Sequence, residues 1–504
     1  MVRPVTGQWG WVPNQLEDLY RVLPKLNLRH LVILDSQWEP NDNPRYRLSQ
    51  RSFIAFDPFA VLRAKGQRAL VRWWNGRWNQ GSTLTLLDQM TRDLWRSAPR
   101  GSLPTPLPAG AIGFFGYDLK SLLEPVGSDL PSDFALPDLW LAFYDTVITV
   151  DDFSGNLLIS STGLPMEGQE GAQRARERLQ EVETVLSRAV CLMDDSGSDR
   201  LLEEPVKEVA ATSNFTGNQY RRSVERVKAY ISAGDIYQAC LAQRFLVPCA
   251  RDPMDLFLYL RQKNPSPFAA YLDGGDFWVI SASPERFLHY DPTARYIHTR
   301  PIKGTRPRGK DGEEERRMRD QLLSSEKDRA EHIMIVDLER NDLGRVAETG
   351  SVWVPELCLL ETFPTVFHLT STVEGRLKEG VGLVDLLRAT FPGGSVTGAP
   401  KIRAMQIIEE VETVSRSVYT GAIGYLSVTG HLDLSMAIRI LILCNGMASF
   451  YAGSAIVADS NPEEEYEETL VKARALMNAL GQQGVPSLSQ NSLLGAGGKE
   501  SLPW

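Results

Sequence analysis

The chain has 504 residues, of which 43% are hydrophobic and 23% are charged, and its formal net charge at pH 7 is −9. This composition is typical of a globular protein that is too long for one ordinary core. The acidic balance excludes a broadly basic surface, so we expect no nucleic-acid partner.

Cysteine spacing and the apolar runs indicate a reducing compartment and no membrane anchor. The five cysteines show no CxxC pair, and their odd number suggests no disulfide framework. No stretch approaches about 18 consecutive apolar residues, so we expect no membrane span. The start, "MVRPVTGQWGWVPNQLEDLY", lacks the apolar core of a secretory signal, and we therefore expect a cytoplasmic protein.

The first part of the chain, residues 1–186, reads as an N-terminal domain that mixes strands with one long helix. The run "AGAIGFFGYDL" at 109–119 is apolar and punctuated by glycine, which favours a buried strand with close backbone approach. A helix is predicted near 168–190. Other short β-rich runs are "HLVILDS", "SFIAFDP", "WLAFYDTVITVDD" and "NLLISST".

A polar, acidic segment divides the chain into two parts. Residues 187–214 contain Gly and Pro within charged sequence and are predicted to form a linker. The following part, 215–480, has the size of one further domain. The tail at 481–504 is rich in Gly, Ser and Gln, and we expect it to be disordered.

The second part begins with an amphipathic helix and continues with alternating strands. Thr216 and Gln219 form a predicted capping box, and Gly234 is expected to end the helix. Many later runs alternate between apolar and polar residues, as antiparallel strands with one covered face do. The clearest are "QACLAQRFLVP", "FWVISAS", "VFHLTSTVEGRL", "GAIGYLSV" and "MASFYAGSAIV". The fold class is therefore α+β and not a βαβ series.

Two predicted helices carry acidic faces. Asp328 and Glu331 are three residues apart in the segment 324–344 and share a face. Glu465 and Glu468 lie on one side of a helix that starts near Asn461, with Lys472 one turn further on. If each helix donates a carboxylate and the substrate completes the octahedron, these faces suit Mg2+. Solvated charge and complementarity to the helix dipole explain the same pattern.

Two further segments are suited to anions. "FPGGSVTGAPKIRAMQ" is a glycine-rich loop that runs into a helix, and its N–H groups form an anion nest for a carboxylate or a phosphate. "RPIKGTRPRG" at 300–309 places three arginines, Arg300, Arg306 and Arg308, close to Lys303 along the chain. This lysine is a solvated loop charge, an anion ligand or a nucleophile, and neighbouring arginines would lower its pKa and favour the last.

Eight motifs occur in the order and spacing of one known family. They are "GDIYQACLAQRF", "NPSPF", "SASPERF", "RPIKGTRPRG", "AEHIMIVDLERNDLG", "FPGGSVTGAPK", "GAIGY" and "AGSAIVADSNPEEEYEET". The chain resembles the chorismate-utilising enzymes, strongly over 215–480 and more loosely before that. The resemblance implies an intertwined two-domain α+β fold with two stacked, largely antiparallel sheets flanked by helices. It also implies chorismate as substrate and Mg2+ as cofactor.

The resemblance assigns roles to individual residues. Glu285 matches the family's general acid, and His368 and Ser395 match residues that line its pocket. Glu331 and Glu468 match the metal carboxylates, supported by Asp328 and Glu465. The residues that match chorismate contacts are Gly304, Thr305, Tyr419, Arg439, Gly453, Ser454, Ala455 and Lys472. Ala455 departs from the family, which usually has glycine there, and its methyl group would crowd the ligand.

Lys303 bears on the identity of the product. The resemblance implies that "PIKGT" is the pattern of aminodeoxychorismate synthases, whereas anthranilate synthases usually carry alanine in "PIAGT". In the first group the lysine adds to C2 of the ring as the C4 hydroxyl leaves, and ammonia then replaces it by attack at C4. We therefore expect component I of an aminodeoxychorismate synthase. An anthranilate synthase is the alternative, and a non-catalytic amino-acid sensor and an isochorismate synthase are more distant ones.

The resemblance also implies two partners. Ammonia in this family comes from a glutamine amidotransferase, and this chain has no Cys/His/Glu glutaminase constellation of its own, so a separate subunit is expected. Free ammonia is a weaker alternative donor. The residues that match the family's tryptophan pocket are Ser36, Pro267, Phe268 and Ala269. Ala269 replaces a larger residue, which leaves open whether a tryptophan site survives.

Overall fold

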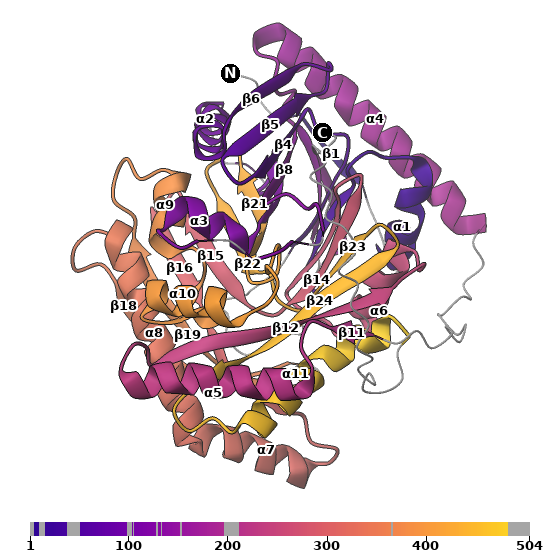
Figure 1. Ribbon diagram of the computed structural model, residues 1–504. Coiled ribbons are helices and arrows are strands. Elements are labelled where there is room, and N and C mark those ends of the chain that lie inside the picture. The colour runs from indigo at the N-terminus through magenta and orange to yellow at the C-terminus, as the bar shows by residue number, and fades with distance from the viewer. Residues whose placement is uncertain are drawn as a thin grey trace.

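The computed structural model describes residues 5–9, 16–37, 51–97, 103, 105–127, 130–132, 134–151, 154–195, 211–363 and 366–481. Within these ranges two large antiparallel sheets face each other, and helices cover both outer sides (Figure 1). This is the α+β architecture of stacked sheets that the sequence predicts. Because both parts of the chain contribute strands to both sheets, the two halves are intertwined.

The first sheet holds strands from both parts of the chain in one antiparallel order. Strand β2, from the first part, pairs with β13, from the second, so that Ala269 lies opposite Asp35. The order along the sheet is β1 (Val5–Trp9), β10 (Leu157–Ser161), β9 (Thr146–Asp151), β3 (Arg51–Ala55), β2 (Val32–Asp35), β13 (Phe268–Asp273), β14 (Phe277–Ser283), β23 (Ile440–Cys444), β24 (Met447–Ile456), β12 (Gln238–Pro248) and β11 (Thr212–Ser213), with β20 (Gly398–Ala399) beside β12.

The second sheet is joined in the same way, through β7 of the first part and β21 of the second. Gly113 and Gly424 face each other in this pair. A Cβ on Gly424 would lie 2.0 Å from the Asp433 carbonyl oxygen, which explains the glycine. The order is β17 (Ile302–Pro307), β19 (Val366–Arg376), β16 (Tyr296–Arg300), β15 (Arg286–Asp291), β22 (Leu432–Met436), β21 (Ala422–Ser427), β7 (Gly110–Phe115), β8 (Leu139–Tyr144), β4 (Ala60–Lys65), β5 (Arg68–Trp73) and β6 (Trp78–Ser82), with β18 (Trp353–Thr362) beside β19.

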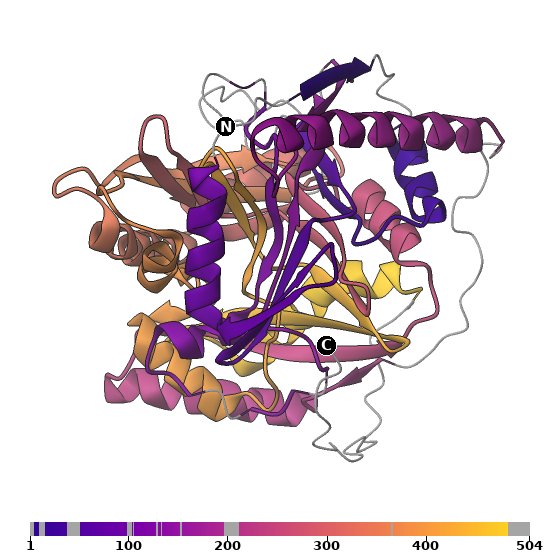
Figure 2. The same ribbon diagram turned by 90° about the horizontal axis from the view of Figure 1, so that it is seen from above.

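The helices form the two outer layers. Those packed on the first sheet or its flanking helices are α1 (Leu16–Val22), α4 (Gly168–Asp195), α5 (Gly217–Ala233), α6 (Pro253–Lys263), α10 (Lys401–Val411) and α11 (Pro462–Ala479). Those associated with the second sheet are α2 (Thr83–Arg96), α7 (Gly312–Ser324), α8 (Glu326–Val346) and α9 (Leu383–Thr390). Figure 2 shows the long helix α4 along one edge of the molecule. Short helical turns are η2 (Leu23–Leu26), η4 (Tyr117–Leu119), α3 (Lys120–Leu123) and η5 (Gly394–Val396).

Three large clusters of buried apolar side chains hold these layers together. One lies between the first sheet and its helices, and a second between the second sheet and its helices. The third fills the space between the sheets, where Phe114 and Trp140 stack 6.4 Å apart and Tyr425 meets Phe53 edge to face. Since this cluster draws on both parts of the chain, the sheets cannot separate without exposing it.

Local signals in the sequence are confirmed at several elements. The Thr216–Gln219 capping box is present, and Gly234 ends α5 in the left-handed region at φ 85°. Asn461 caps α11 ahead of Pro462. The run at 109–119 contains β7, whose six residues are all buried.

The long helix of the first part extends beyond its predicted end. α4 continues to Asp195, into the segment 187–214 that was assigned to a linker. Most of the remaining linker lies outside the described residues, as does the tail from 482 onward. The domain boundaries at 186 and 215 therefore stay a prediction.

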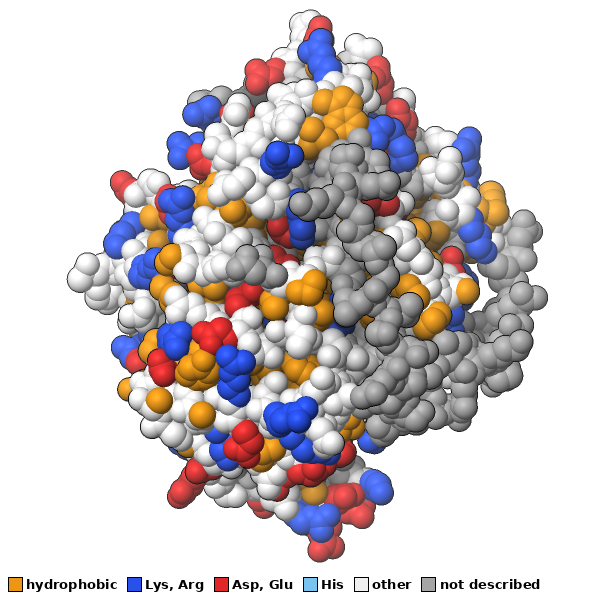
Figure 3. Space-filling view, viewed as in Figure 1, with side chains coloured by type: hydrophobic (Ala, Val, Ile, Leu, Met, Phe, Trp, Pro, Cys, Tyr) orange, Lys and Arg blue, Asp and Glu red, His pale blue; other side chains and the backbone are white. Residues whose placement is uncertain are grey.

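The distribution of charge on the surface and the state of the cysteines agree with the sequence analysis. On the face shown in Figure 3, basic and acidic side chains are interspersed, and neither sign forms a continuous patch. All five cysteines are free. Among the helices in the described ranges, none is both long enough and apolar enough to cross a bilayer.

Candidate active site

A buried carboxyl group, that of Glu285, lies just before β15. Its side chain is enclosed, with 4% of the residue exposed, and its backbone oxygen accepts a hydrogen bond from the N–H of Met436. The hydroxyl of Ser395, in η5, donates a hydrogen bond of 2.5 Å to Oε1 of Glu285. Burial raises the pKa of Glu285 to about 7, against the opposing effects of Ser395, Lys303 and Arg439. A carboxyl group that is half-protonated near neutral pH can serve as a general acid.

Lys303 lies on β17, at the edge of the second sheet, and is half-buried. Burial acts to lower the pKa of its ammonium group. The side chains of Cys240, Glu331, Glu285 and Glu468 act in the opposite direction, and the net result is a raised pKa. Lys303 is thus a protonated amine surrounded by groups from four elements.

The expectation that neighbouring arginines lower the pKa of Lys303 is wrong. Each of them is neutralised by a carboxylate of its own. Arg300 pairs with Glu361 at 2.6 Å, Arg306 with Asp328 at 2.8 Å and Arg308 with Glu315 at 2.5 Å. The sequence places these cations close together along the chain, but the fold pairs them individually.

Beside Lys303, an irregularity in the pairing of β17 with β19 places Thr305 opposite His368. Gly304 has φ 78°, and a Cβ there would lie 3.3 Å from the Cβ of Asp328, so glycine suits both the conformation and the space. Thr305 Oγ1 and His368 Nδ1 are 2.9 Å apart. His368 is 2% exposed, and burial lowers its pKa to about 3, so the imidazole is neutral. Its Nε2 is buried without a hydrogen-bond partner among the described residues, which leaves it available for a ligand.

The acidic faces of α8 and α11 converge on Lys303. Glu331 and Glu468 both act electrostatically on Lys303, and Glu465 raises the pKa of Glu331. Carboxylates brought together from two helices suit a divalent cation. In the ranges that the structure describes, no three acidic, histidine or cysteine side chains form a complete metal site by themselves. Mg2+ at this point would need oxygen ligands from the substrate as well as Glu331 and Glu468.

The two supporting carboxylates have other partners. Asp328 forms the ion pair with Arg306. Glu465 is buried and accepts a hydrogen bond of 2.6 Å from Ser460. Glu468 pairs with Lys472 at 2.6 Å, but about half of its side chain is exposed. Glu331 and Glu468 are therefore better placed to bind a metal than Asp328 and Glu465.

Strand β24 presents alternate residues to the site. Gly453 and Ala455 are half-buried and share one face of the strand, and Lys472 Nζ donates to the Gly453 carbonyl at 3.0 Å. The Ser454 side chain lies on the opposite, buried face, where its hydroxyl is 3.2 Å from that of Tyr220. Ser454 can thus contact a ligand through its backbone, while its side chain belongs to the core beneath.

Tyr419 and Arg439 complete the predicted substrate contacts. Tyr419 is buried and stacks on Tyr451 with ring centroids 5.0 Å apart. Arg439 has φ 54°, and burial lowers the pKa of its guanidinium, with Glu285 opposing. None of the described residues forms an ion pair with Arg439. A cation held in this way beside Glu285 is suited to a substrate carboxylate.

Cys240, on β12, is a residue of the site wall that sequence reasoning missed. It lies opposite Ala455, and its thiol contacts the Ser395 carbonyl at 3.5 Å. It is also the strongest of the groups that raise the pKa of Lys303. The motif "GDIYQACLAQRF" pointed to this strand, but only the pairing with β24 shows which of its side chains face the site.

A buried ion pair supports the same wall. Arg416 is 1% exposed and donates to Glu412 at 2.6 Å, to the Cys240 carbonyl at 2.7 Å and to the Val396 carbonyl at 3.1 Å. Glu412 in turn accepts from the backbone N–H of Ala242. The pair therefore links the end of α10, the turn before it and strand β12, and sequence reasoning gave it no role.

The predicted tryptophan-pocket residues lie at the junction of β2 and β13. The N–H of Gln37 donates to the Ser266 carbonyl at 3.2 Å, which places Ser36 beside the segment that contains Pro267, Phe268 and Ala269. The hydroxyls of Ser36 and Ser266 are buried and have no hydrogen-bond partner in the described part of the chain. The structure brings these residues together, but tryptophan binding itself stays a prediction.

Comparison with known proteins identifies the family of the chain. The sequence model of the chorismate binding enzymes matches residues 37–478. Anthranilate synthase component 1 of Aquifex aeolicus is 41% identical over 373 residues, which cover 74% of each chain. Aminodeoxychorismate synthase component 1 of Escherichia coli is 38% identical over 436 residues, 86% of this chain and 90% of that one. The structure of anthranilate synthase component I from Streptococcus pneumoniae superposes with a TM-score of 0.71 at 33% identity, covering 87% of this chain and 93% of that one. The chain therefore belongs to the chorismate binding enzyme family and acts on chorismate.

Proposed function

We propose that this protein is the chorismate-converting subunit of an aminodeoxychorismate synthase, which forms 4-amino-4-deoxychorismate from chorismate and ammonia. The observation that supports this proposal most is a lysine amine, Lys303, that lies within electrostatic reach of a buried acid, Glu285. Relatives named for this activity and for anthranilate synthesis match the chain at similar identity. Sequence identity therefore does not distinguish the two products, and the proposal depends on the residues at the site.

The proposed reaction uses Lys303 as a nucleophile. Its amine nitrogen forms a bond to C2 of the ring, and the C4 hydroxyl leaves with the proton of Glu285 as water. Ammonia then bonds to C4, and the bond between C2 and the lysine nitrogen breaks. Because Cys240 and the surrounding carboxylates keep Lys303 protonated in the free protein, its ammonium group must release one proton to solvent when the substrate binds, and the free amine is formed again when ammonia displaces it. His368, Arg439 and the backbone around Gly304 would orient the substrate.

Mg2+ is the proposed cofactor, held by Glu331 and Glu468 together with substrate oxygens. When bound, it would polarise a substrate carboxylate and stabilise the negative charge that develops on the ring. The two glutamates come from different helices, so metal binding would also fix α8 relative to α11.

Two partners belong to the proposal. A glutamine amidotransferase subunit would supply ammonia, and glutamine-dependent turnover on addition of such a subunit would support its role. Tryptophan is proposed for the junction of β2 and β13 because the buried hydroxyls of Ser36 and Ser266 need partners. Titration calorimetry with tryptophan tests this part, and an absence of heat with intact protein would contradict it.

Product identification tests the main proposal. Incubation with chorismate, Mg2+ and ammonium should give aminodeoxychorismate by mass spectrometry, and anthranilate with pyruvate would contradict it. Lys303→Ala should lose this activity, and intact-mass analysis of wild type with chorismate and no ammonia should show an adduct that the variant lacks. If Lys303 only binds a carboxylate, the variant should show a raised KM, a nearly normal kcat and no adduct in either protein.

A second candidate function is anthranilate synthesis, favoured by the relatives that carry that name. In that reaction ammonia would attack C2 directly, and Lys303 would have no covalent role. Under the main proposal, by contrast, Lys303 occupies C2, so Lys303→Ala is expected to release some anthranilate although wild type does not.

A further inference from the structure

A second buried carboxyl group, that of Glu339, lies near Glu285. Glu339, on α8, is 5% exposed and accepts a hydrogen bond from the Thr299 hydroxyl at its Oε2, 2.8 Å away. Its Oε1 has no hydrogen-bond partner among the described residues. Burial raises the pKa of Glu339 to about 8, and nearby Glu285 and Asp342 act in the same direction. The group is therefore a neutral carboxylic acid at pH 7, and no step of the proposed reaction uses it.

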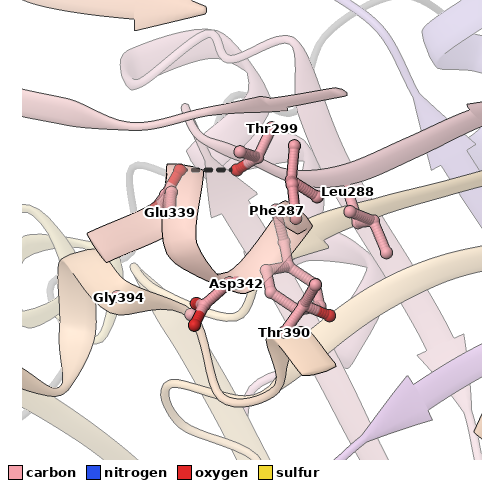
Figure 4. A pocket seen from close by; sticks show the side chains of 9 residues that line it. Phe287, Leu288, Thr299, Glu339, Asp342, Thr390 and Gly394 are labelled. Carbon is pink, nitrogen blue, oxygen red and sulfur yellow. Dashed lines mark hydrogen bonds between the residues drawn. The ribbon is translucent and has the colours of Figure 1, made fainter. Parts of the chain in front are cut away.

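Glu339 lines a small hollow on the side of the second sheet that faces α8. The hollow has room for about one water molecule and is partly open to solvent. In Figure 4, Glu339 and Thr299 point toward each other across it, and Asp342 and Thr390 line it further along. Lys401 pairs with Asp342 at 2.5 Å and so neutralises that carboxylate. The remaining walls are Phe287, Leu288, Leu343, Gly393 and Gly394.

A single turn of η5 separates the hollow from Glu285. Gly394 lines the hollow, and a Cβ on it would lie 3.4 Å from Cγ of Glu339. The hydroxyl of the next residue, Ser395, donates a hydrogen bond to Glu285. The side chains of Glu339 and Glu285 thus lie next to adjacent residues of one turn, and the two carboxyl groups are close enough for Glu285 to raise the pKa of Glu339.

The proposed reaction requires that Glu285 regain a proton after each turnover. Chorismate, ammonia and one proton give water and the product with its amine protonated, so Glu285 loses a proton that must return from solvent. Glu285 is buried, and bound substrate would cover its front. If the proton reached Glu285 by another route, the carboxyl group could be protonated again while the substrate is still bound.

We propose that Glu339 and the hollow return the proton to Glu285 through the Ser395 hydroxyl. Ser395 gives its hydroxyl proton to the Glu285 carboxylate and receives one from the Glu339 carboxylic acid, through water in the hollow, and Glu339 is recharged by solvent. Glu339 is thereby a relay residue that never touches the substrate. The inference rests on the proposed role of Glu285 as the acid that protonates the departing hydroxyl.

The test separates the first turnover from later ones. At about pH 6, where Glu285 is already protonated, rapid-quench measurements of chorismate loss in Glu339→Gln should show a first turnover at the wild-type rate. Later turnovers should slow about tenfold or more, and imidazole buffer should restore them by delivering protons from solution. The matched control is Asp337→Asn, an exposed carboxyl on the same helix, which should behave as wild type.

Two results would overturn the relay. Equal slowing of the first and later turnovers, without rescue by imidazole, would assign Glu339 a structural role, and unchanged turnover would assign it none. Circular dichroism and thermal unfolding of Glu339→Gln check that the variant is folded. Because chorismate loss is followed, and not the aminated product, formation of anthranilate would contradict the proposed function and leave the relay test valid.

Discussion

The Ser395 hydroxyl donates to Glu285 Oε1 at 2.5 Å and joins the glycine-rich turn before α10 to the short connection between β14 and β15 that carries the buried carboxyl. This hydrogen bond favours the ionised form of Glu285, whereas burial disfavours it more strongly. The balance leaves the pKa of Glu285 at about 7, where a carboxyl can act as an acid near neutral pH. The turn therefore contributes, through Ser395, to the pKa of the candidate acid.

Ser395→Ala should raise the pKa of Glu285 above about 7, because it removes a hydrogen bond that lowers this pKa. A general acid acts in its protonated form, so activity falls as pH rises through its pKa, and in the variant this fall should move to higher pH. The maximal rate should also drop, since the carboxyl loses its orientation. The pH dependence of kcat/KM measures both effects, with Ser324→Ala on exposed α7 as the control. An unchanged alkaline limb would show that another group is the acid.

Glu331→Gln and Glu468→Gln should each weaken Mg2+ activation by about tenfold or more. Each change removes one carboxylate charge at constant shape. The measurement is the Mg2+ concentration that gives half-maximal chorismate turnover. Glu463→Gln is a matched control, since Glu463 is exposed on the same helix as Glu468 and pairs with Arg221. If both variants respond to Mg2+ as Glu463→Gln does, these helices do not bind the metal.

Arg416→Met should destabilise the protein by about 3–5 kcal/mol, because it leaves the Glu412 carboxylate buried without its cation. The substitution also removes hydrogen bonds to two backbone carbonyls that position β12 and η5. Urea unfolding compares the free energy of unfolding with that of wild type. Arg226→Met, which breaks an exposed pair with Glu410, should change it by less than about 1 kcal/mol. Similar effects of the two substitutions would show that the buried pair does not support the site wall.

Glu339→Gln should become more stable relative to wild type as pH rises from below 4.5 to above 8. In wild type the pKa of Glu339 is raised from 4.5 to about 8 by burial, so in this window the unfolded chain is ionised while the folded one is neutral. Folding then takes up a proton, and the wild-type free energy of unfolding falls with pH until both states are ionised. Glutamine has no such dependence. Thermal unfolding of both proteins at pH 5, 7 and 9 gives the difference, and a constant difference would mean that Glu339 titrates normally.

Local structure was largely readable from the sequence. The capping box at Thr216, the cap at Asn461 and the left-handed Gly234 depend on contacts within one turn, so neighbouring residues suffice to determine them. The alternating runs predicted most strands for the same reason. The end of α4 was misplaced because the linker was assigned from the polar composition of 187–214 as a whole, although Ala189, Leu192 and Met193 continue the apolar spacing of the helix and pack against the core.

The candidate site was predicted in part through the order of its motifs. Their resemblance to a family indicated Glu285, Lys303, Glu331 and Glu468, and the structure places the three carboxyl groups within electrostatic reach of Lys303. The residues that escaped prediction, Cys240, Glu339, Glu412 and Arg416 among them, have no local signal. Their surroundings come from elements that are distant in the chain.

By itself, the sequence determined the fold class, the capped helices, the alternating strands and the family, because these depend on composition, short-range spacing and motif order. Only the tertiary structure decided which charges meet. Arg300, Arg306 and Arg308 stand beside Lys303 in the chain, yet each is bound to its own carboxylate, and the groups that set the charge of Lys303 come from β12, α8, α11 and the segment before β15. Electrostatic interactions depend on distance in space and on burial, neither of which is encoded in separation along the chain.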